Sequence, residues 1–572
     1  MTVYMKIHSD DIRKLKQLFL SPALKQVYKW SKCIHGKILL ICILNIVSVF
    51  CSLGLTLVTK ELIDTAVSAE SDGLLRFGIL LVCVLLTDTA IGFFISIIQT
   101  HASAKLQHSF QGELIQSIFT KQYAFLKKYH SGELINRVFS DAGVVHSGIL
   151  SVLPALVSTI VSFIGSAAIL VALDWKFVVL LACAGIIGIV LVILFKKPMK
   201  KRHVRLQEAA DKLHAVIQES FENIRLVKAS VSETRVYRQI ANKQEVLKNE
   251  SIRQGVFSTV MRNSMGLMFD FSWLFCMLWG CNAIYHGEMT YGSLAAMLQL
   301  IGRVQGPISR AVGIASEVYG VIASAERLME LTELPPETAG EMLKDFDEIK
   351  IEDVSFMYDD GTENVLCKVS CIISKGDFVA LTGVSGGGKT SLFHLLLGIY
   401  SPNEGRVVFR NGTKETEACR ETRSLFAYVP QGNSLFSGTL RENLMMFTDQ
   451  ATDEEITDAI KIACIDDLVD EIGLDAELGE RGVGISEGQA QRVAVARALL
   501  SKAPILLLDE STSALDEDTE ARMLKNISTL RNKTCLIVTH RQAALSICDY
   551  RLHISDGKME KKATVLTEQE VS

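Results

Sequence analysis

The sequence predicts a multidomain protein in which an all-α domain of six membrane-spanning helices precedes an α/β domain built around a phosphate-binding loop. Two observations carry this prediction. Hydrophobic residues make up 49% of the 572 residues, the mean hydropathy is +0.27, and the long uncharged runs lie in the first half, which is typical of membrane proteins. The second half contains Gly383-Val384-Ser385-Gly386-Gly387-Gly388-Lys389-Thr390 between an apolar run and a helical pattern, which is the setting of a phosphate-binding loop.

Residues 1–36 form a basic lead-in. They contain seven Lys or Arg residues against two acidic residues, Asp10 and Asp11, with apolar residues between them. A basic amphipathic helix lies in the plane of a membrane surface. We therefore expect the lead-in to lie on the inner membrane surface, with membrane lipid as a partner.

Six apolar stretches are long enough to cross a bilayer, which takes about 20 helical residues. The sixth is interrupted by Arg303, Gln305 and Pro307, but without it the second half of the chain would lie outside the cell. The expected spans are 37–60, 76–100, 147–173, 177–197, 262–285 and 289–318.

Loop charges orient these spans. Basic residues cluster before the first span and after the fourth, at Lys196–Arg202, whereas the segment after the first span is acidic. Because basic loops stay on the cytoplasmic side, we expect a multi-pass protein of the cell membrane with both termini in the cytoplasm. The inner loops 101–146 and 198–261 are too long for simple connectors, so the spans should continue into them as helices, with tips near 121–131 and 215–226.

Two acidic residues, Asp88 and Asp270, lie within expected spans. Ionisable residues inside a membrane are costly and are often functional, so both could line a cavity and meet cationic or polar groups of a cargo. The alternative is a structural pair with a basic residue of a neighbouring helix, such as Arg262 or Arg303.

The remaining totals argue against two kinds of site. A net charge of −5 at pH 7 provides no overall attraction for nucleic acid, and no nucleic-acid partner is expected. The thirteen cysteines show no CxxC pair and no even framework. Several lie in apolar runs, where cysteine acts as a small buried hydrophobe rather than a zinc ligand or a disulfide partner.

The phosphate-binding loop has a local physical basis. Its glycines allow successive backbone N–H groups to converge on a polyphosphate, and the N-terminus of the following helix adds partial positive charge. Lys389 would reach the β- and γ-phosphates of ATP, and the Thr390 hydroxyl would ligate Mg²⁺. Since Pro335-Pro336 would break a helix, we expect four segments. These are the lead-in 1–36, a transmembrane domain 37–330, a linker 331–347 and a nucleotide-binding domain 348–572.

Four further strand ends carry side chains suited to binding or hydrolysis. Asp509 would hold the metal through water, and the adjacent Glu510 could polarise the attacking water. Gln431 begins a polar turn. His540 could contact the γ-phosphate, although an isolated histidine is more often structural. Tyr358 could stack on an adenine ring or simply pack.

Several motifs resemble those of the ATP-binding cassette (ABC) transporter family. Gly479–Arg492 resembles the signature region, and Ser511–Asp516 resembles the D-loop. Val429–Gln431 resembles the Q-loop, and Tyr129–Val138 resembles the first inner loop. The resemblance covers the chain from about residue 20. It is strongest to the exporter half-transporter, which has six transmembrane helices followed by one α/β P-loop cassette with a helical subdomain.

This resemblance implies roles for individual residues. Tyr358 would stack on adenine, Gln431 would complete the Mg²⁺ shell, Glu510 would be the general base, and His540 would hold the γ-phosphate and the water. The phosphate cradle would consist of Gly383, Ser385, Gly386, Gly387, Gly388, Lys389, Thr390 and Ser391. The residues acting on the ATP held by a partner cassette would be Ser486, Gly488, Gln489 and Asp516.

The signature departs from the family's usual Leu-Ser-Gly-Gly-Gln, because it reads Ile485-Ser486-Glu487-Gly488-Gln489. Glu487 adds a negative charge close to the expected triphosphate, and the two would repel each other. A buried unpaired carboxylate is costly, so we expect Glu487 to point away. Each site requires two chains, and we expect a homodimer, with an asymmetric heterodimer as the alternative.

The expected function is ATP-driven export of an amphipathic drug, lipid or peptide across a bacterial cell membrane by alternating access. The alternative is an ATP-gated channel or the regulatory half of a heterodimeric complex. The presence of Glu510, Gln431 and His540 favours turnover over gating.

Overall fold

The computed structural model describes residues 21–359, 361, 363–448, 450–479, 484–530 and 533–562. The chain divides into two compact units. Unit 1 consists of Met1–Leu114 and Ile135–Glu330, and unit 2 consists of Ile115–Leu134 and Leu331–Ser572. Each unit is described by itself.

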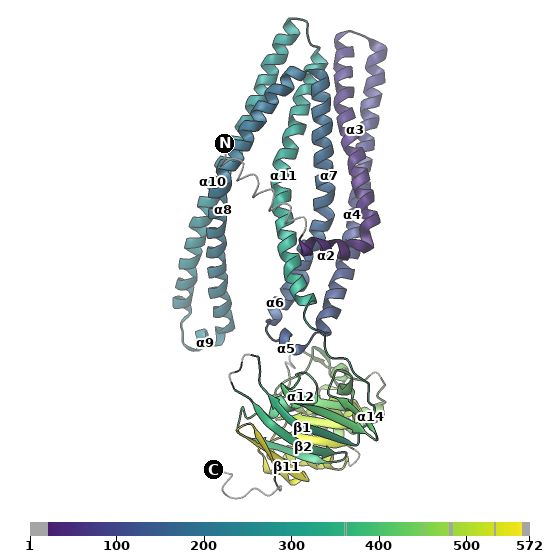
Figure 1. The fold of residues 1–572 in the computed structure, drawn as a ribbon, viewed down its shortest axis with the longest axis vertical. Helices are drawn as coiled ribbons and strands as arrows, with labels where there is room; N and C mark the ends of the chain where they lie inside the picture. Colours follow the sequence, from purple (N-terminus) through teal and green to yellow (C-terminus); the bar gives the residue numbers. More distant parts are fainter. Residues whose placement is uncertain are drawn as a thin grey trace. The chain divides into compact units, whose positions relative to one another are not determined.

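Unit 1 is built from long helices that run side by side (Figure 1). The first five expected spans each fall within one long helix, and the sixth, 289–318, begins two residues before α11. Among the described residues four helical segments are long and apolar enough to cross a membrane. From residue 21 to the start of α7, the described helical elements are α2 Pro22–Trp30, η1 Ser31–Ile34, α3 His35–Val67, α4 Ser71–Phe119, α5 Tyr123–Leu126, α6 Ser131–Asn136 and η2 Arg137–Asp141. They are followed by α7 Ala142–Leu173, α8 Trp175–Glu222, α9 Ile224–Ala229, α10 Glu233–Tyr285 and α11 Tyr291–Thr332.

The connection between α7 and α8 is fixed by one carboxylate. Asp174 caps α8, because its Oδ1 accepts hydrogen bonds from the backbone N–H groups of Lys176 at 2.9 Å and Phe177 at 3.4 Å. An N-cap of this kind satisfies donors that have no partner within the helix. The indole Nε1 of Trp279 on α10 donates to the other oxygen at 3.0 Å, so the same side chain also ties α10 to this turn.

The second inner loop turns later than the sequence predicts. The expected tip was 215–226, but α8 continues to Glu222 and the short helix α9 follows at Ile224–Ala229. Asn223 ends α8 with a non-helical backbone, and its side-chain amide donates to the Glu219 carbonyl at 3.0 Å. Asparagine favours such local bonds over a regular helix.

An ion pair with a buried carboxylate and a half-exposed arginine joins the start of α7 to α11 in unit 1. Asp141, just before α7, accepts hydrogen bonds from Ser324 Oγ and Arg327 Nε, each at 2.9 Å. Asp141 is only 4% exposed, and a buried carboxylate is tolerated when it is paired in this way. Around it, apolar residues of α2, α3, α4, α7 and α11 form one core.

Unit 2 contains two main sheets. The first has the order β2-β1-β4-β5 and is antiparallel, and the second has the order β12-β11-β3-β10-β9-β6. In the second sheet every pairing is parallel except that of β11 with the edge strand β12. The strands are β1 Glu348–Phe356, β2 Leu366–Ser374, β3 Phe378–Gly383, β4 Glu404–Asn411, β5 Lys414–Glu417, β6 Phe426–Val429, β9 Ile505–Asp509, β10 Thr534–Val538, β11 Tyr550–Ser555 and β12 Lys558–Lys562. The short strands β7 Gly438–Thr439 and β8 Glu477–Leu478 pair separately.

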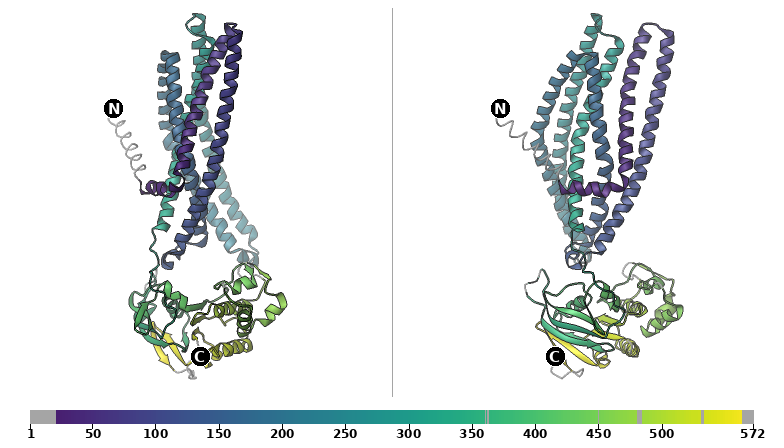
Figure 2. Two further views of the ribbon diagram at one scale, coloured as in Figure 1. Left: turned by 90° about the vertical axis from the view of Figure 1, so that its right-hand side faces the viewer. Right: turned by 45° about the vertical axis from the view of Figure 1, so that its right-hand side comes forward.

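Two apolar cores lie on these sheets. The side chains of β3, β9 and β10 are almost fully buried, as expected for parallel strands covered on both faces. One core places α12 Lys389–Leu396 among β1, β2, β3 and β4. The other lies under the helical part of unit 2, which stands to one side of the sheets in both views of Figure 2. Its helices are α13 Leu440–Leu444, α14 Asp453–Ile462, α15 Asp466–Ile472, α16 Glu487–Leu500, α17 Glu517–Ser528 and α18 Gln542–Ser546.

Candidate functional site

The second sheet brings the predicted site residues to one edge. Strands β6, β9, β10 and β3 run parallel and end at the same side. The phosphate-binding loop follows β3, Asp509-Glu510 ends β9, Thr539-His540 follows β10, and Gln431 follows β6. Ligands of open α/β sheets bind at the carboxyl ends of the strands, so this edge is the candidate site.

Two positions of the phosphate-binding loop require glycine. Gly383 has φ +141°, and a Cβ there would collide with the carbonyl oxygen of Ile554 on β11. Gly388 has φ +99° and caps α12, and a Cβ there would lie 3.0 Å from Leu366 Cδ2. Only glycine adopts such backbone conformations without strain. Between these positions, Ser385 and Gly386 are exposed and Gly387 is half-buried.

Lys389 lies inside this loop. Its ammonium donates to the carbonyl oxygens of Gly383 at 2.8 Å and Val384 at 3.0 Å, and the residue is 5% exposed. Burial lowers the pKa of Lys389, while the nearby carboxylates of Glu510 and Asp509 oppose that effect. The amine is thus held at the base of the loop, where a phosphate oxygen could replace the carbonyl contacts.

Asp509 and Glu510 stand in different surroundings. Asp509 is 1% exposed and accepts hydrogen bonds from Thr390 Oγ1 at 3.3 Å and the Tyr428 hydroxyl at 3.4 Å. Burial, with a further contribution from the charge of Glu510, raises the pKa of Asp509. Glu510 has φ +47° and accepts a hydrogen bond from Gln431 Nε2 at 2.6 Å. Such strained backbone is concentrated at functional sites.

His540 lies just beyond the end of β10, with its side chain exposed. Partial burial first, and then the charge of Lys389, lower the pKa of this histidine. The imidazole is therefore neutral at pH 7, with one N–H to donate and one nitrogen to accept.

Tyr358 belongs to an aromatic cluster at the end of the first sheet. Its hydroxyl lies 2.8 Å from Ser391 Oγ, and its ring makes edge contacts with Phe356 and Tyr400. Lys127, which follows α5 within unit 2, places its ammonium 5.0 Å from the centroid of the Tyr358 ring. Both side chains border a cavity of about 330 Å³, so the expected adenine-stacking tyrosine has an additional cationic neighbour.

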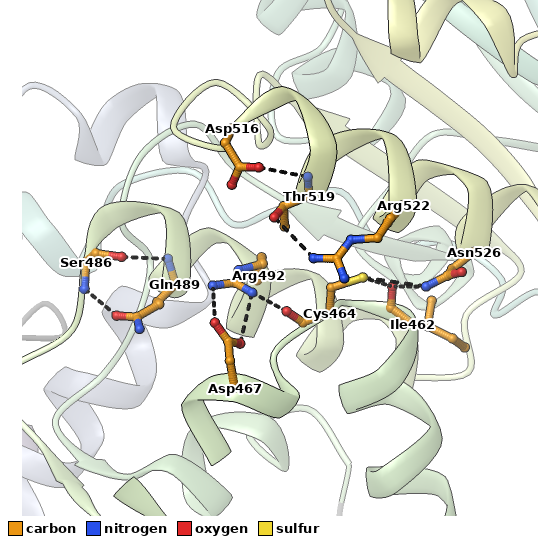
Figure 3. Close-up of polar contacts among 10 residues, drawn as sticks. All are labelled: Ile462, Cys464, Asp467, Ser486, Gln489, Arg492, Asp516, Thr519, Arg522 and Asn526. Atoms are coloured by element: carbon orange, nitrogen blue, oxygen red, sulfur yellow. Dashed lines mark hydrogen bonds and ion pairs between the residues drawn. The ribbon is translucent and has the colours of Figure 1, made fainter. Parts of the chain in front are cut away.

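The signature residues form the start of α16 (Figure 3). Ser486 Oγ accepts from the backbone N–H of Gln489 at 3.2 Å, and Gln489 Oε1 accepts from the backbone N–H of Ser486 at 2.8 Å, which is a complete capping box. A Cβ on Gly488 would lie 2.8 Å from the Ala514 carbonyl oxygen, so glycine permits a close approach there. Glu487 is exposed.

Asp516 caps α17 on the neighbouring segment, where its Oδ1 accepts from the Thr519 backbone N–H at 2.9 Å (Figure 3). That bond lowers the pKa of Asp516. Arg492 of α16 pairs with Asp467 at 3.1 Å. The expected partner-site residues Ser486, Gly488, Gln489 and Asp516 therefore all lie at or near the starts of two adjacent helices.

Sequence reasoning missed the side chains that connect these helices to the catalytic edge. Gln491 of α16 bonds Ser513 Oγ at 3.4 Å and the Ala514 N–H at 3.2 Å. Arg541, directly after His540, donates to the carbonyls of Ser513 and Leu515, each at 2.9 Å, and to Glu520 at 2.7 Å. In the sequence, the position of Arg541 directly after His540 could have indicated a role at the site. No sequence pattern marks Gln491 in this way.

Asp88 and Asp270, the two acidic residues of the expected spans, differ in their hydrogen bonds. Asp88 of α4 accepts a hydrogen bond from Ser48 Oγ of α3 at 2.6 Å, and Arg303 of α11 bonds Ser52, one turn further along α3. Asp88 thus lies in a polar cluster that also contains one of the two basic residues expected as its partner. Asp270 is exposed on α10 and makes no hydrogen bond to another described residue.

The raised pKa of Asp509 predicts a pH-dependent stability. A carboxyl whose pKa is higher in the folded state destabilises the fold once it is ionised, and this effect disappears when the pH falls to its ordinary pKa of about 4. We expect Asp509→Asn to raise the thermal midpoint of the nucleotide-free protein at pH 8, with a smaller gain near pH 4, where the ordinary pKa lies. A matched Asp518→Asn variant, in the first turn of α17, provides the control. Equal gains at both pH values would contradict the assignment.

Family models match both the transmembrane part and the nucleotide-binding part of the chain. The model of the ABC transporter transmembrane region matches residues 38–308, and the ABC transporter model matches residues 366–513. The ATP-dependent lipid A-core flippase of Desulfotalea psychrophila is 26% identical over 514 residues, covering 88% of this chain and 90% of that protein. A putative export ATP-binding/permease protein of Rickettsia felis is 28% identical over 551 residues, covering 93% and 95%.

Two further comparisons agree. A probable multidrug resistance ABC transporter ATP-binding/permease protein of Bacillus subtilis is 28% identical over 467 residues, covering 79% of each chain. The solved structure of a bacterial Atm1-family ABC exporter with ATP bound has a TM-score of 0.78 at 20% identity, covering 93% of this chain and 95% of that one. This likeness confirms the predicted fold class, a helical transmembrane domain followed by an α/β cassette. The chain belongs to the ABC transporters, as an exporter half-transporter whose cassette hydrolyses ATP to drive export across a membrane.

Proposed function

We propose that this protein exports an amphipathic cargo, such as a drug, a lipid or a peptide, across a bacterial cell membrane by alternating access in a homodimer. The convergence of Lys389, Thr390, Asp509, Glu510 and Gln431 at one sheet edge carries the proposal for the energy source. The names of the relatives, which include a lipid flippase and a multidrug transporter, support the cargo class. We also propose that both termini lie in the cytoplasm and that the domain boundaries fall at residues 36, 330 and 347.

The site fits a triphosphate with Mg²⁺. Thr390, Asp509 and Gln431 offer hydroxyl, carboxylate and amide oxygens, and oxygen donors are the ligands that Mg²⁺ prefers. When bound there, Mg²⁺ would supply positive charge that offsets the negative charge developing during phosphoryl transfer. Gly383, Ser385, Gly386, Gly387, Gly388 and Ser391 would complete the phosphate cradle with Lys389, and Tyr358 would stack on adenine.

Glu510 and His540 would divide the work of hydrolysis. Glu510 would accept the proton of the attacking water as general base, after Gln431 releases the carboxylate that it holds at 2.6 Å. His540 would donate an imidazole N–H to the γ-phosphate. Breaking the Gln431–Glu510 hydrogen bond would couple the arrival of nucleotide to movement of the turn that carries Gln431.

The second half of each site would come from the partner chain. The Ser486 oxygen accepts the N–H of Gln489, which leaves its hydroxyl proton to bond a phosphate oxygen. Gly488, Gln489 and Asp516 would lie on the same seam. Two ATP molecules held between two chains would favour the closed dimer only as far as they bind it more tightly than the open one.

We further propose that Asp88 and Asp270 line the path of the cargo. Asp88 is held by Ser48 at 2.6 Å and shares a polar cluster with Ser52 and Arg303 in an otherwise apolar bundle. A carboxylate at that depth would favour a cationic group on an amphipathic cargo.

The assignment of Glu510 is tested by Glu510→Gln in protein reconstituted in lipid. Loss of a general base should lower MgATP turnover at least about a hundredfold, while nucleotide binding is retained because the phosphate cradle is intact. Glu517→Gln, an exposed carboxylate nearby, is the matched control and should turn over normally. Normal turnover by Glu510→Gln would remove Glu510 from its assigned role.

Arg541 is predicted to position the Ser513–Leu515 segment rather than to touch nucleotide. Arg541→Ala should lower kcat for ATP about tenfold and leave KM within about threefold, because the change affects the geometry of the site and not substrate binding. Arg522→Ala on α17, which loses a longer hydrogen bond to Thr519 Oγ1 at 3.4 Å, should have little effect. Arg541→Ala leaves the buried Glu520 carboxylate without its arginine partner. The double variant Arg541→Ala/Glu520→Gln removes that charge, so it should regain the thermal stability lost by Arg541→Ala but not the lost kcat. Recovery of both would show that the role is purely structural.

The cargo assignment is tested by stimulation of ATPase activity with cationic, neutral and anionic amphipathic compounds. Asp88→Asn should raise the half-stimulating concentration of cationic compounds about tenfold, equivalent to about 1.4 kcal/mol, and should not affect the neutral ones. Asp72→Asn, at the exposed start of the same helix, should behave as the unmodified protein. An identical shift for neutral compounds would exclude a charge-specific contact at Asp88.

A further inference from the structure

Unit 1 carries an apolar groove beside α2, which we call the α2 groove. It has a volume of about 490 Å³, within the range of small-molecule sites. Side chains of α2, η1, α3, α7 and α11 line it, and in Figures 1 and 2 α2 lies across these long helices. The lining includes Val27, Ile38, Cys42, Ile149, Val152 and Val318.

The three polar side chains of the α2 groove, Tyr28, Ser31 and His35, lie close together in the chain and contact one another. Ser31 Oγ lies 3.0 Å from His35 Nε2, the same nitrogen lies 3.1 Å from the Tyr28 carbonyl oxygen, and the Tyr28 and His35 rings are 4.5 Å apart. The rest of the lining is apolar. A cavity of this kind does not hold water well, because water needs two to four polar partners. The groove therefore favours an apolar occupant.

A row of lysines stands next to the groove. Lys25, Lys29 and Lys32 are exposed, and their spacing of four and three residues places them on one helical face. Leu24, Val27, Tyr28 and Ser31, which line the groove, occupy the adjacent face.

The three lysines have no acidic residue in their own stretch of the chain, and Glu317, next to the lining residue Val318, accepts a hydrogen bond from Ser151 Oγ at 3.3 Å. None of the three lysines forms an ion pair with another residue that the structure describes. The sequence has no Asp or Glu between residues 21 and 60. The apolar α2 groove thus lies beside three positive charges, and a molecule bound there should be apolar with an anionic end.

We propose that the α2 groove binds an acyl chain of one anionic phospholipid, whose phosphate lies on Lys25, Lys29 and Lys32. Basic helices at the membrane surface attract anionic lipids, and here a groove next to the basic face adds an apolar site for one chain. This lipid is a resident ligand that holds α2 against α3, α7 and α11. It is distinct from the transported cargo.

The test measures lipid retained by the purified full-length protein, by native mass spectrometry during titration with phosphatidylglycerol or phosphatidylcholine. The unmodified protein should retain phosphatidylglycerol more tightly. Lys25→Gln/Lys29→Gln/Lys32→Gln should remove this preference, at about fivefold in affinity per lysine. Val152→Phe fills the groove and should weaken both lipids. Matched controls are Lys105→Gln, another exposed lysine, and Val82→Phe, the same substitution on an exposed face of α4.

A second measurement identifies the occupant. Phosphatidylglycerol with a photoreactive acyl chain should label α3 and α7 near Ile38 and Val152, and excess unlabelled phosphatidylglycerol should compete. Uniform labelling of the apolar helices, or equal retention of both lipids by all variants, would overturn the proposal. So would cross-links from a photoreactive residue at position 152 to residues 1–20, because they would show a segment of the chain in the groove. ATP hydrolysis does not enter either readout, so failure here would leave the export function untouched.

Discussion

The parallel pairing of β9, β10 and β3 is the constraint on which the candidate site depends. Val538 of β10 is paired with Asp509 on one side and with Leu381 on the other. Residues more than a hundred positions apart in the chain therefore end at the same level. A shift of one residue would turn every side chain to the opposite face of the sheet, and Asp509 would then point away from Thr390. Complete burial of the three strands makes such a shift costly, so the apolar core determines where the polar site lies.

The same burial places charge where it is unfavourable. Lys389 and Asp509 are 5% and 1% exposed. Burial lowers the pKa of Lys389 and raises that of Asp509, and both shifts favour the neutral side chain. Binding sites for highly charged ligands commonly lower the stability of the ligand-free protein by burying charged groups. A bound triphosphate and a divalent cation would supply the charges that these groups lack. Ligand binding would then stabilise the cassette as well as occupy it.

The sequence predicted the residues whose chemistry needs a local pattern. The loop from Gly383 to Thr390, the carboxylates after β9 and the fold class were all accessible, because each depends on neighbours in the chain or on a run of apolar residues. The family and the fold class are confirmed, and the roles of the individual residues remain predictions. The contacts of Asp88 were not accessible, since sequence spacing does not show that Ser48 would face α4.

Tertiary contacts account for the other omissions. Arg541 and Gln491 matter because helices distant in sequence meet at Ser513–Leu515, and Lys127 matters because an inner-loop segment packs within unit 2 beside Tyr358. The later turn at α9 has a different cause. The helix α8 ends at Asn223, which bonds the Glu219 carbonyl through its side chain, and the apolar periodicity of this segment indicates no boundary there.

The starts of α16 and α17 suggest how binding energy would be used. Ser486 and Asp516 cap these helices internally, so neither helix needs a phosphate in order to form. Gln491 and Arg541 hold the segment between them in place. A surface that is already ordered loses little entropy when it binds. The free energy of contacting a partner's ATP would then be available to close the dimer, and in the proposed mechanism closure would move the transmembrane helices.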